Sequence, residues 1–113
     1  MPKLHLELGR PYYHLKWVDP AFTIPGLQPF FFIGTNLSVD DDTLGTTYYF
    51  QDSISFTWCG SLAEPDKMKP HDDIVPYTMT CREPELDVAW FTLDGAIAEL
   101  VGARDRAAGA SEY

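Results

Sequence analysis

Many of the carboxylates of this sequence gather in three short segments. These side chains are its clearest candidates for a chemical role. The candidate partner-binding residues are Asp40, Asp41 and Asp42, then Asp72 and Asp73, then Glu83, Glu85 and Asp87. Clustered carboxylates attract a basic protein and raise its association rate above the roughly 10⁵–10⁶ M⁻¹s⁻¹ of an unsteered encounter. Ordinary solvated turns have the same composition. We therefore predict a role in binding a partner for these residues and no role in catalysis.

The first cluster partly matches a calcium-binding loop of the EF-hand type. Asp40, Asp42 and Gly45 fall at positions 1, 3 and 6 of such a loop. Position 5 is then Leu44 and position 12 is Gln51, where the bidentate glutamate of a true loop is missing. The sequence predicts a solvated turn here.

The three histidines form no metal-binding pattern. His71 precedes Asp72 and Asp73, but adjacent side chains rarely converge on one ion. His5 and His14 fall on the outward faces of two expected strands, where pairing of the strands would let them bind a metal only adventitiously. We predict no cofactor and no metal site.

The two cysteines do not make a disulfide framework. Cys59 and Cys81 each occupy an apolar-looking position in a β-like stretch, which favours two buried thiols in a reducing compartment. A disulfide between adjacent strands is the alternative.

Enzyme motifs are absent from the sequence. It contains neither a Gly-x-Ser-x-Gly nucleophile elbow nor a glycine-rich phosphate loop. Residues 90–95 resemble the strand–helix junction near the end of Nudix hydrolases, but the Glu-rich catalytic helix of that family has no counterpart here.

The charge balance limits the classes of partner. Seventeen Asp and Glu against eight Lys and Arg give a formal net charge of −9. Such a chain is repelled by phosphate backbones and anionic membranes, so we expect no nucleic acid and no membrane as partner. A basic protein, a polyamine or a metal ion would be attracted. The N-terminus lacks a signal peptide and no apolar run approaches ~20 residues, which predicts a soluble cytoplasmic protein.

Hydrophobic periodicity predicts an α+β fold, mainly an antiparallel β-sheet of about five to seven strands with one C-terminal amphipathic helix. The expected strands are residues 3–8, 12–18, 30–33, 46–50, 53–58, 75–81 and 88–93. The first two should form a hairpin, 30–33 should be central, and Pro76 should put 75–81 at an edge or give it a bulge. Val75, Tyr77, Met79 and Cys81 should face inward.

The expected helix begins at Asp94 and ends at Gly109, with a core-facing stripe of Ile97, Leu100, Val101 and the stem of Arg104. A chain of 113 residues is one domain by length. We expect a single α+β domain over residues 1–109 and a frayed tail over 110–113.

Residues 48–52, Tyr-Tyr-Phe-Gln-Asp, are followed by Phe56 and Gly60. This short pattern resembles one found in small bacterial proteins, some of them immunity proteins encoded beside toxins. The resemblance covers about a dozen residues and transfers no site. It implies an inhibitor that covers the active site of a basic toxin or nuclease, and a phage-encoded inhibitor of a host nuclease would look the same.

Two other functions fit the sequence. A small enzyme or ligand-binding domain would use the aromatic residues to line a pocket, with Asp52 or His71 as its polar group; these aromatics are Tyr12, Tyr13, Trp17, Tyr48 and Trp58. A structural or assembly subunit would self-associate through an exposed strand edge. The sequence leaves the oligomeric state open.

Overall fold

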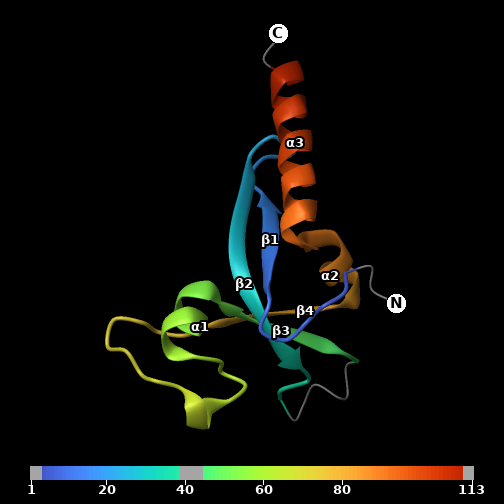
Figure 1. The fold of residues 1–113 in the computed structure, drawn as a ribbon. Coiled ribbons are helices and arrows are strands. Elements are labelled where there is room, and N and C mark those ends of the chain that lie inside the picture. Colours follow the sequence, from blue (N-terminus) through green and yellow to red (C-terminus); the bar gives the residue numbers. More distant parts are fainter. Residues whose placement is uncertain (1–3, 39–44, 111–113) are drawn as a thin grey trace.

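The computed structural model describes residues 4–38 and 45–110, which form one antiparallel sheet with three helices (Figure 1). The strands are β1 (Pro11–Trp17), β2 (Pro25–Thr35), β3 (Thr47–Asp52), β4 (Thr78–Arg82) and β5 (Trp90–Phe91), in the spatial order β4-β3-β2-β1-β5. The helices are α1 (Ser53–Cys59), α2 (Glu83–Ala89) and α3 (Leu93–Ala110), with a short 3-10 turn at Pro65–Lys67. The predicted α+β class and the C-terminal helix are confirmed.

The central strand is β2, as the Phe-rich run predicts. Phe30 and Phe32 are buried on the face that packs against Phe50 and Trp90. On the other face Phe31 stacks on Phe56 of α1, with ring centroids 4.3 Å apart. Both faces are therefore covered, which accounts for the absence of alternation in this run.

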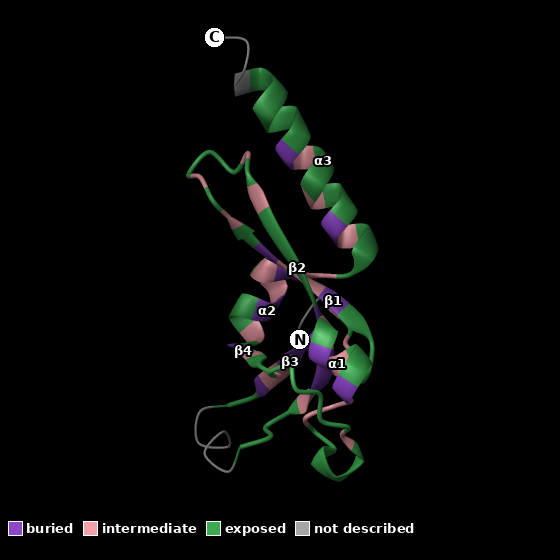
Figure 2. Ribbon diagram, turned by 90° about the vertical axis from the view of Figure 1, so that its left-hand side faces the viewer, coloured by how far each residue is buried: buried purple, intermediate pink, exposed green. Residues whose placement is uncertain are grey.

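The buried core lies on the β2 face that α2 crosses. It comprises Tyr12, Phe30, Phe32, Phe50, Cys81, Leu86 and Trp90. The Trp90 ring stacks on that of Phe50 with centroids 3.7 Å apart. Figure 2 shows buried residues where the strands meet α1 and α2, whereas most of α3 is exposed.

The predicted hairpin between residues 3–8 and 12–18 is wrong. The two edges of β1 are already occupied by β2 and β5. The described residues of the N-terminal segment contain no strand; Leu4 and Leu6 pack against the core, and the Tyr12 hydroxyl accepts a hydrogen bond from the Glu7 N–H.

Residues 53–58 are helical and not a strand, despite their strict alternation. The Asp52 carboxylate accepts a hydrogen bond from the Ser55 N–H and so caps the first turn of α1. Ser55 and Cys59 are buried one turn apart, while Ile54 and Trp58 are exposed. Residues four apart lie on the same face in a strand and also in a helix. In such a short segment, alternation alone could not separate the two.

The segment after β4 also differs from expectation. Residues 83–89 form α2, with Pro84 in its first turn and acids that suit the positive end of the helix dipole. Only Trp90 and Phe91 of the predicted strand 88–93 are extended.

The predicted edge strand is confirmed as β4, with Met79 half-buried and Cys81 buried. Val75 and Tyr77 lie before this strand and are exposed, so the expectation that they face inward is wrong.

The helix α3 packs through a different face from the one predicted. Its buried side chains are Ala96 and Ala103, whereas Ile97, Leu100 and Val101 are exposed. Small residues let the helix approach β1 closely, which turns the large apolar side chains away from the sheet. The helix also continues past Gly109 to Ala110.

Candidate partner-binding site

The structure separates the predicted acidic clusters. Asp40, Asp41 and Asp42 lie outside the described residues. Asp72 and Asp73 are exposed in the loop that precedes β4, and the third cluster lies on α2, which follows β4. Five residues of strand span about 17 Å. The second and third clusters therefore lie at opposite ends of β4 and do not form one site.

The third cluster is divided between two faces of the helix α2. Glu83 and Asp87 are one turn apart and lie near Tyr48, where burial and then the negative charges of these acids, Glu83 first, raise the pKa of the phenol. Glu85 lies on another side of α2, toward β4. Sequence spacing alone suggested a single cluster, but the helical period divides it.

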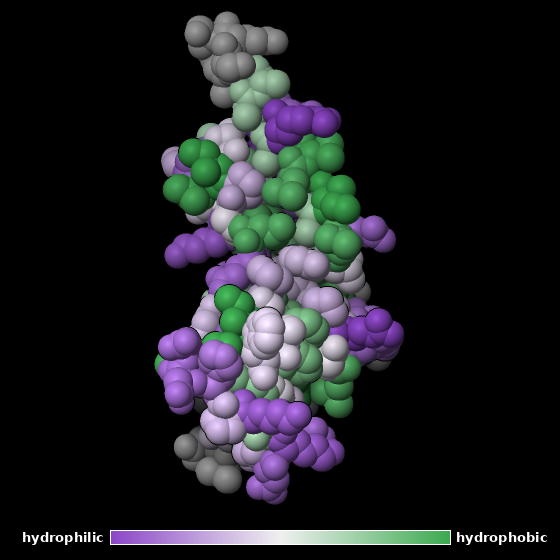
Figure 3. Space-filling model, turned by 60° about the vertical axis from the view of Figure 1, so that its left-hand side comes forward, coloured by the Kyte–Doolittle hydropathy of each residue, from purple (hydrophilic) through white to green (hydrophobic). Residues whose placement is uncertain are grey.

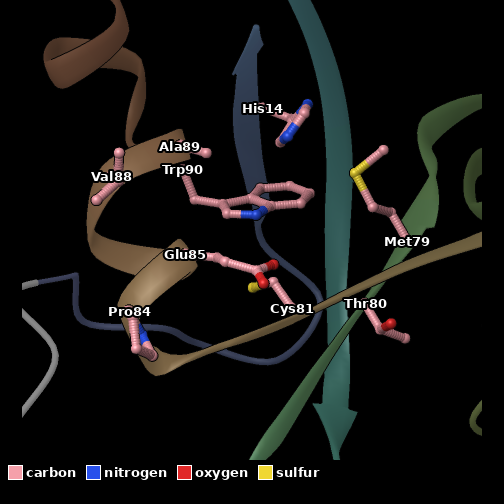
Figure 4. A pocket seen from close by; sticks show the side chains of 9 residues that line it. All are labelled: His14, Met79, Thr80, Cys81, Pro84, Glu85, Val88, Ala89 and Trp90. Atoms are coloured by element: carbon pink, nitrogen blue, oxygen red, sulfur yellow. The ribbon is translucent and has the colours of Figure 1, made fainter.

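Beside Glu85 there is an open groove of about 360 Å³ between α2 and the sheet (Figure 4). Four elements supply its lining, which comprises His14 from β1, Met79, Thr80 and Cys81 from β4, Pro84, Glu85, Val88 and Ala89 from α2, and Trp90 from β5. Figure 4 shows the Glu85 carboxylate pointing into the groove, between the Trp90 ring and Cys81. The groove exists because α2 crosses the sheet between its two edge strands.

The groove carries one charged group at neutral pH. Burial, and then the charge of Lys16, lowers the pKa of His14 below its ordinary value of 6.5, so this imidazole is neutral. Burial, and then the charge of Glu85, raises the pKa of Cys81 to about 12, so this thiol is protonated and unreactive. Glu85 remains as the charged side chain of an otherwise neutral, largely apolar lining.

This arrangement is complementary to a long cationic side chain. Lys and Arg carry an apolar stem and a charged end, which match apolar walls and a single carboxylate. The His14 ring packs on Trp90 with centroids 4.9 Å apart, which fixes the floor of the groove.

Sequence reasoning identified Glu85 but missed His14, Met79, Val88 and Trp90 as its neighbours. His14 was expected to face outward, whereas it is half-buried against Trp90. The available signal was Trp90 at a strand–helix junction, because tryptophan is enriched among the anchor residues of interfaces. The residues that line the groove come from four elements, so no pattern along the sequence could group them.

The aromatic residues proposed for a pocket do not converge. Tyr12 is in the core, Trp58 is 68% exposed on α1, and Trp17 contacts α3. Asp52 is buried as a helix cap and His71 is exposed in the loop.

The structure adds two findings on metals and thiols. Within residues 4–38 and 45–110 no three His, Cys, Asp or Glu side chains gather closely enough to hold a metal ion. Cys59 and Cys81 are both free and buried, as the favoured interpretation of the sequence predicts.

In the part of the chain that the structure describes, no helix has the length and apolarity needed to cross a membrane. Comparisons with known proteins do not assign the chain: no family model, no curated protein and no solved structure matches it.

Proposed function

We propose that this chain is a small acidic binding protein that attaches to a basic protein in the cytoplasm. The observation that carries the proposal is the α2 groove, in which Glu85 is the charged group among apolar walls. A Lys or Arg side chain of the partner inserts there, its stem against Val88 and Trp90 and its charge at the Glu85 carboxylate.

The remaining acids extend this preference beyond the groove. The seven residues of α2 include three acids and no base. Together with a net charge of −9, this favours fast, salt-sensitive association with a cationic surface. An active site that holds phosphates is such a surface, so the proposal extends to immunity-type inhibition of a basic toxin or nuclease, by analogy with the Tyr48–Asp52 resemblance.

The groove is tested directly with a capped tri-arginine peptide followed by NMR. We expect the indole N–H of Trp90 to shift, with Trp17 and Trp58 as internal controls, and the binding to weaken at high salt. A capped tri-citrulline peptide keeps the shape and removes the charge, so it should not bind.

A matched pair of variants separates the groove from net charge. Glu85→Gln should reduce affinity for the tri-arginine peptide about tenfold, which corresponds to roughly 1.4 kcal/mol. Asp72→Asn makes the same charge change at the other end of β4 and should leave the affinity for the peptide unchanged. Equal effects of both variants would mean that only net charge matters and would exclude the groove.

The inhibitor form of the proposal needs a partner. Affinity capture at low and high salt, from cells that express the neighbouring genes, should retain one basic protein whose toxic or nuclease activity falls on binding. The Glu85→Gln variant should lose both the capture and the inhibition. Capture without loss of activity would exclude inhibition while leaving binding intact.

A small cationic ligand is the second candidate, because a volume of about 360 Å³ is within the range of ligand sites. Thermal-shift measurements with a polyamine such as spermidine distinguish it: stabilisation by spermidine that Glu85→Gln abolishes, without binding of tri-arginine, would favour this alternative.

A further inference from the structure

The hairpin end of β1 and β2 projects with α3 as an arm, which we define as residues 15–27 and 93–109. β5 pairs only with Tyr13 and His14, so beyond them β1 has α3 beside it in place of a strand. The molecule measures 56 × 35 × 21 Å, and its radius of gyration of 16.2 Å exceeds the ~13 Å of a compact chain of this length. The arm accounts for this elongation (Figure 1).

The arm has little core of its own. Its buried side chains among the described residues are Leu15, Ala96 and Ala103. Arg106 ties the helix to the hairpin, since its guanidinium lies 5.0 Å from the Trp17 ring centroid and its Nε donates to the Phe22 carbonyl oxygen at 2.7 Å. A two-stranded hairpin is marginally stable by itself, so this end of the molecule depends on what covers it.

Large apolar side chains are concentrated on the arm's surface. Eight of the fifteen exposed large hydrophobic residues in the described chain belong to it. On α3 they are Leu93, Ile97, Leu100 and Val101, and on the α3 side of the hairpin they are Phe22 and Leu27. Figure 3 shows hydrophobic side chains gathered over this half of the molecule.

The spacing along α3 is that of a helix-pairing seam. Leu93, Ile97, Leu100, Arg104 and Ala107 follow one another at intervals of four, three, four and three residues. This is the a/d repeat of a two-helix seam. The seam lies beside the face that Ala96 and Ala103 bury against β1, and is directed to solvent.

We propose that this seam pairs with the α3 seam of a second copy of the chain, antiparallel about a two-fold axis between Ile97 and Leu100. In this register Ile97 lies opposite Leu100 of the other copy, and Leu93 lies opposite Arg104. The Arg104 stem then covers Leu93, and its guanidinium reaches Asp94 of the other copy. The Arg104 ion pair with the neighbouring Asp105, at 3.4 Å, lies on the surface, with both side chains about 70% exposed. The guanidinium is therefore accessible to a second copy.

Charge complementarity favours a second copy as the occupant. Asp94, which follows the first seam residue, is in the first half of α3, and the seam's base, Arg104, is in the second half. Only an antiparallel arrangement brings them together. The arm is nearly neutral although the chain carries −9; its charged residues are Lys16, Arg104 and Arg106 against Asp19, Asp94, Glu99 and Asp105. Two arms can therefore meet without the repulsion that the rest of the chain would impose.

The available area suits a specific dimer. Six large apolar residues on the α3 side are 36% to 57% exposed; Leu93, Ile97 and Leu100 belong to the seam, and Val101, Phe22 and Leu27 lie outside it. At ~175 Å² for a fully exposed residue of this kind, the six together offer roughly 500 Å². Apolar atoms make up about 60–65% of a homodimer interface, which implies about 800 Å² in all. A standard interface buries about 800 Å² per partner.

Analytical ultracentrifugation of the full chain tests the inference. We expect a concentration-dependent dimer between about 1 μM and 1 mM, lost in Ile97→Glu and Leu100→Glu. Val75→Glu, at an 82% exposed position in the loop before β4 and outside both the groove and the arm, is the matched control and should dimerise normally. A monomer at all concentrations, or a dimer that survives Ile97→Glu, would overturn the inference.

A charge swap tests the antiparallel register. Arg104→Asp and Asp94→Arg should each weaken dimerisation about tenfold, and the double variant should restore it. Failure of the double variant to restore the dimer would exclude this register. Circular dichroism establishes that each variant is folded, and the tri-arginine titration of Trp90 should be unaffected, so that failure of the dimer and failure of the proposed binding function remain distinguishable.

Discussion

A single buried carboxylate, that of Asp52, joins α1 to the chain that precedes β4. It is 6% exposed and accepts hydrogen bonds from the Ser55 N–H at 2.9 Å and the Tyr77 N–H at 3.0 Å, besides the Ser55 hydroxyl. The backbone N–H of Asp52 donates to the Tyr77 carbonyl oxygen at 3.1 Å. Removal of this carboxylate should therefore loosen two segments that are 25 residues apart in the sequence.

The expected cost of Asp52→Ala follows from the groups it leaves unpaired. Loss of a helix N-cap costs about 1 kcal/mol. The Tyr77 N–H, whose hydrogen bond is partly buried, also loses its acceptor, which adds about 1–3 kcal/mol. The free energy of unfolding should fall by about 2–4 kcal/mol, which lowers the melting temperature by about 10–20 °C in a domain of this size.

Urea denaturation and thermal melting measure the effect, and hydrogen exchange locates it at the amides of Ser55 and Tyr77. Asp52→Asn keeps the shape and one acceptor oxygen, so about half of the loss is expected. Asp66→Ala removes an exposed acid from the 3-10 turn and should change stability by no more than ~0.5 kcal/mol. A melting temperature for Asp52→Ala within 2 °C of the unmodified chain would refute the reasoning.

Three further predictions concern the core, a strained position in β2 and pH. Leu86→Ala should cost about 2–5 kcal/mol in urea denaturation because Leu86 is fully buried, whereas Val88→Ala on the same helix should cost no more than ~0.5 kcal/mol; similar costs would contradict the placement of α2. Gly34→Ala should cost about 1–3 kcal/mol, since Gly34 lies at the register shift in β2 with φ +147°, and a new Cβ would lie 3.1 Å from Leu37; an unchanged urea midpoint would argue against this backbone conformation. The lowered pKa of His14 means that the unfolded chain binds the proton more readily, so the free energy of unfolding should fall as pH drops from 7 to 5; this slope should be shallower in His14→Gln, and equal slopes would count against it.

The α+β class, the central position of Phe30–Ile33 and the C-terminal helix were predictable from the sequence. Each rests on a signal that is local and long enough to be unambiguous. A continuous aromatic run requires cover on both faces of a strand, and a helix of four or more turns shows its period clearly. Net charge, and with it the expectation of a cationic partner, is likewise a property of composition.

Tertiary structure decided the elements whose local signals were short. Residues 53–58 alternate like a strand, yet the Asp52 cap and the burial of Ser55 and Cys59 make them a helix. The N-terminal segment also alternates, but β2 and β5 already occupy both edges of β1. Periodicity shows that a segment has two faces, and the available neighbours determine what each face meets.

The site and the exposed seam depended most on tertiary structure. Glu85 was identifiable as an acid, but its groove is formed by side chains from four elements that meet only because α2 crosses the sheet. In the same way Ile97 and Leu100 were recognisable as an apolar stripe, whereas their exposure follows from the closer approach of Ala96 and Ala103 to β1. Sequence determines which side chains are available, and the packing of elements distant along the chain determines which of them face a core, a groove or solvent.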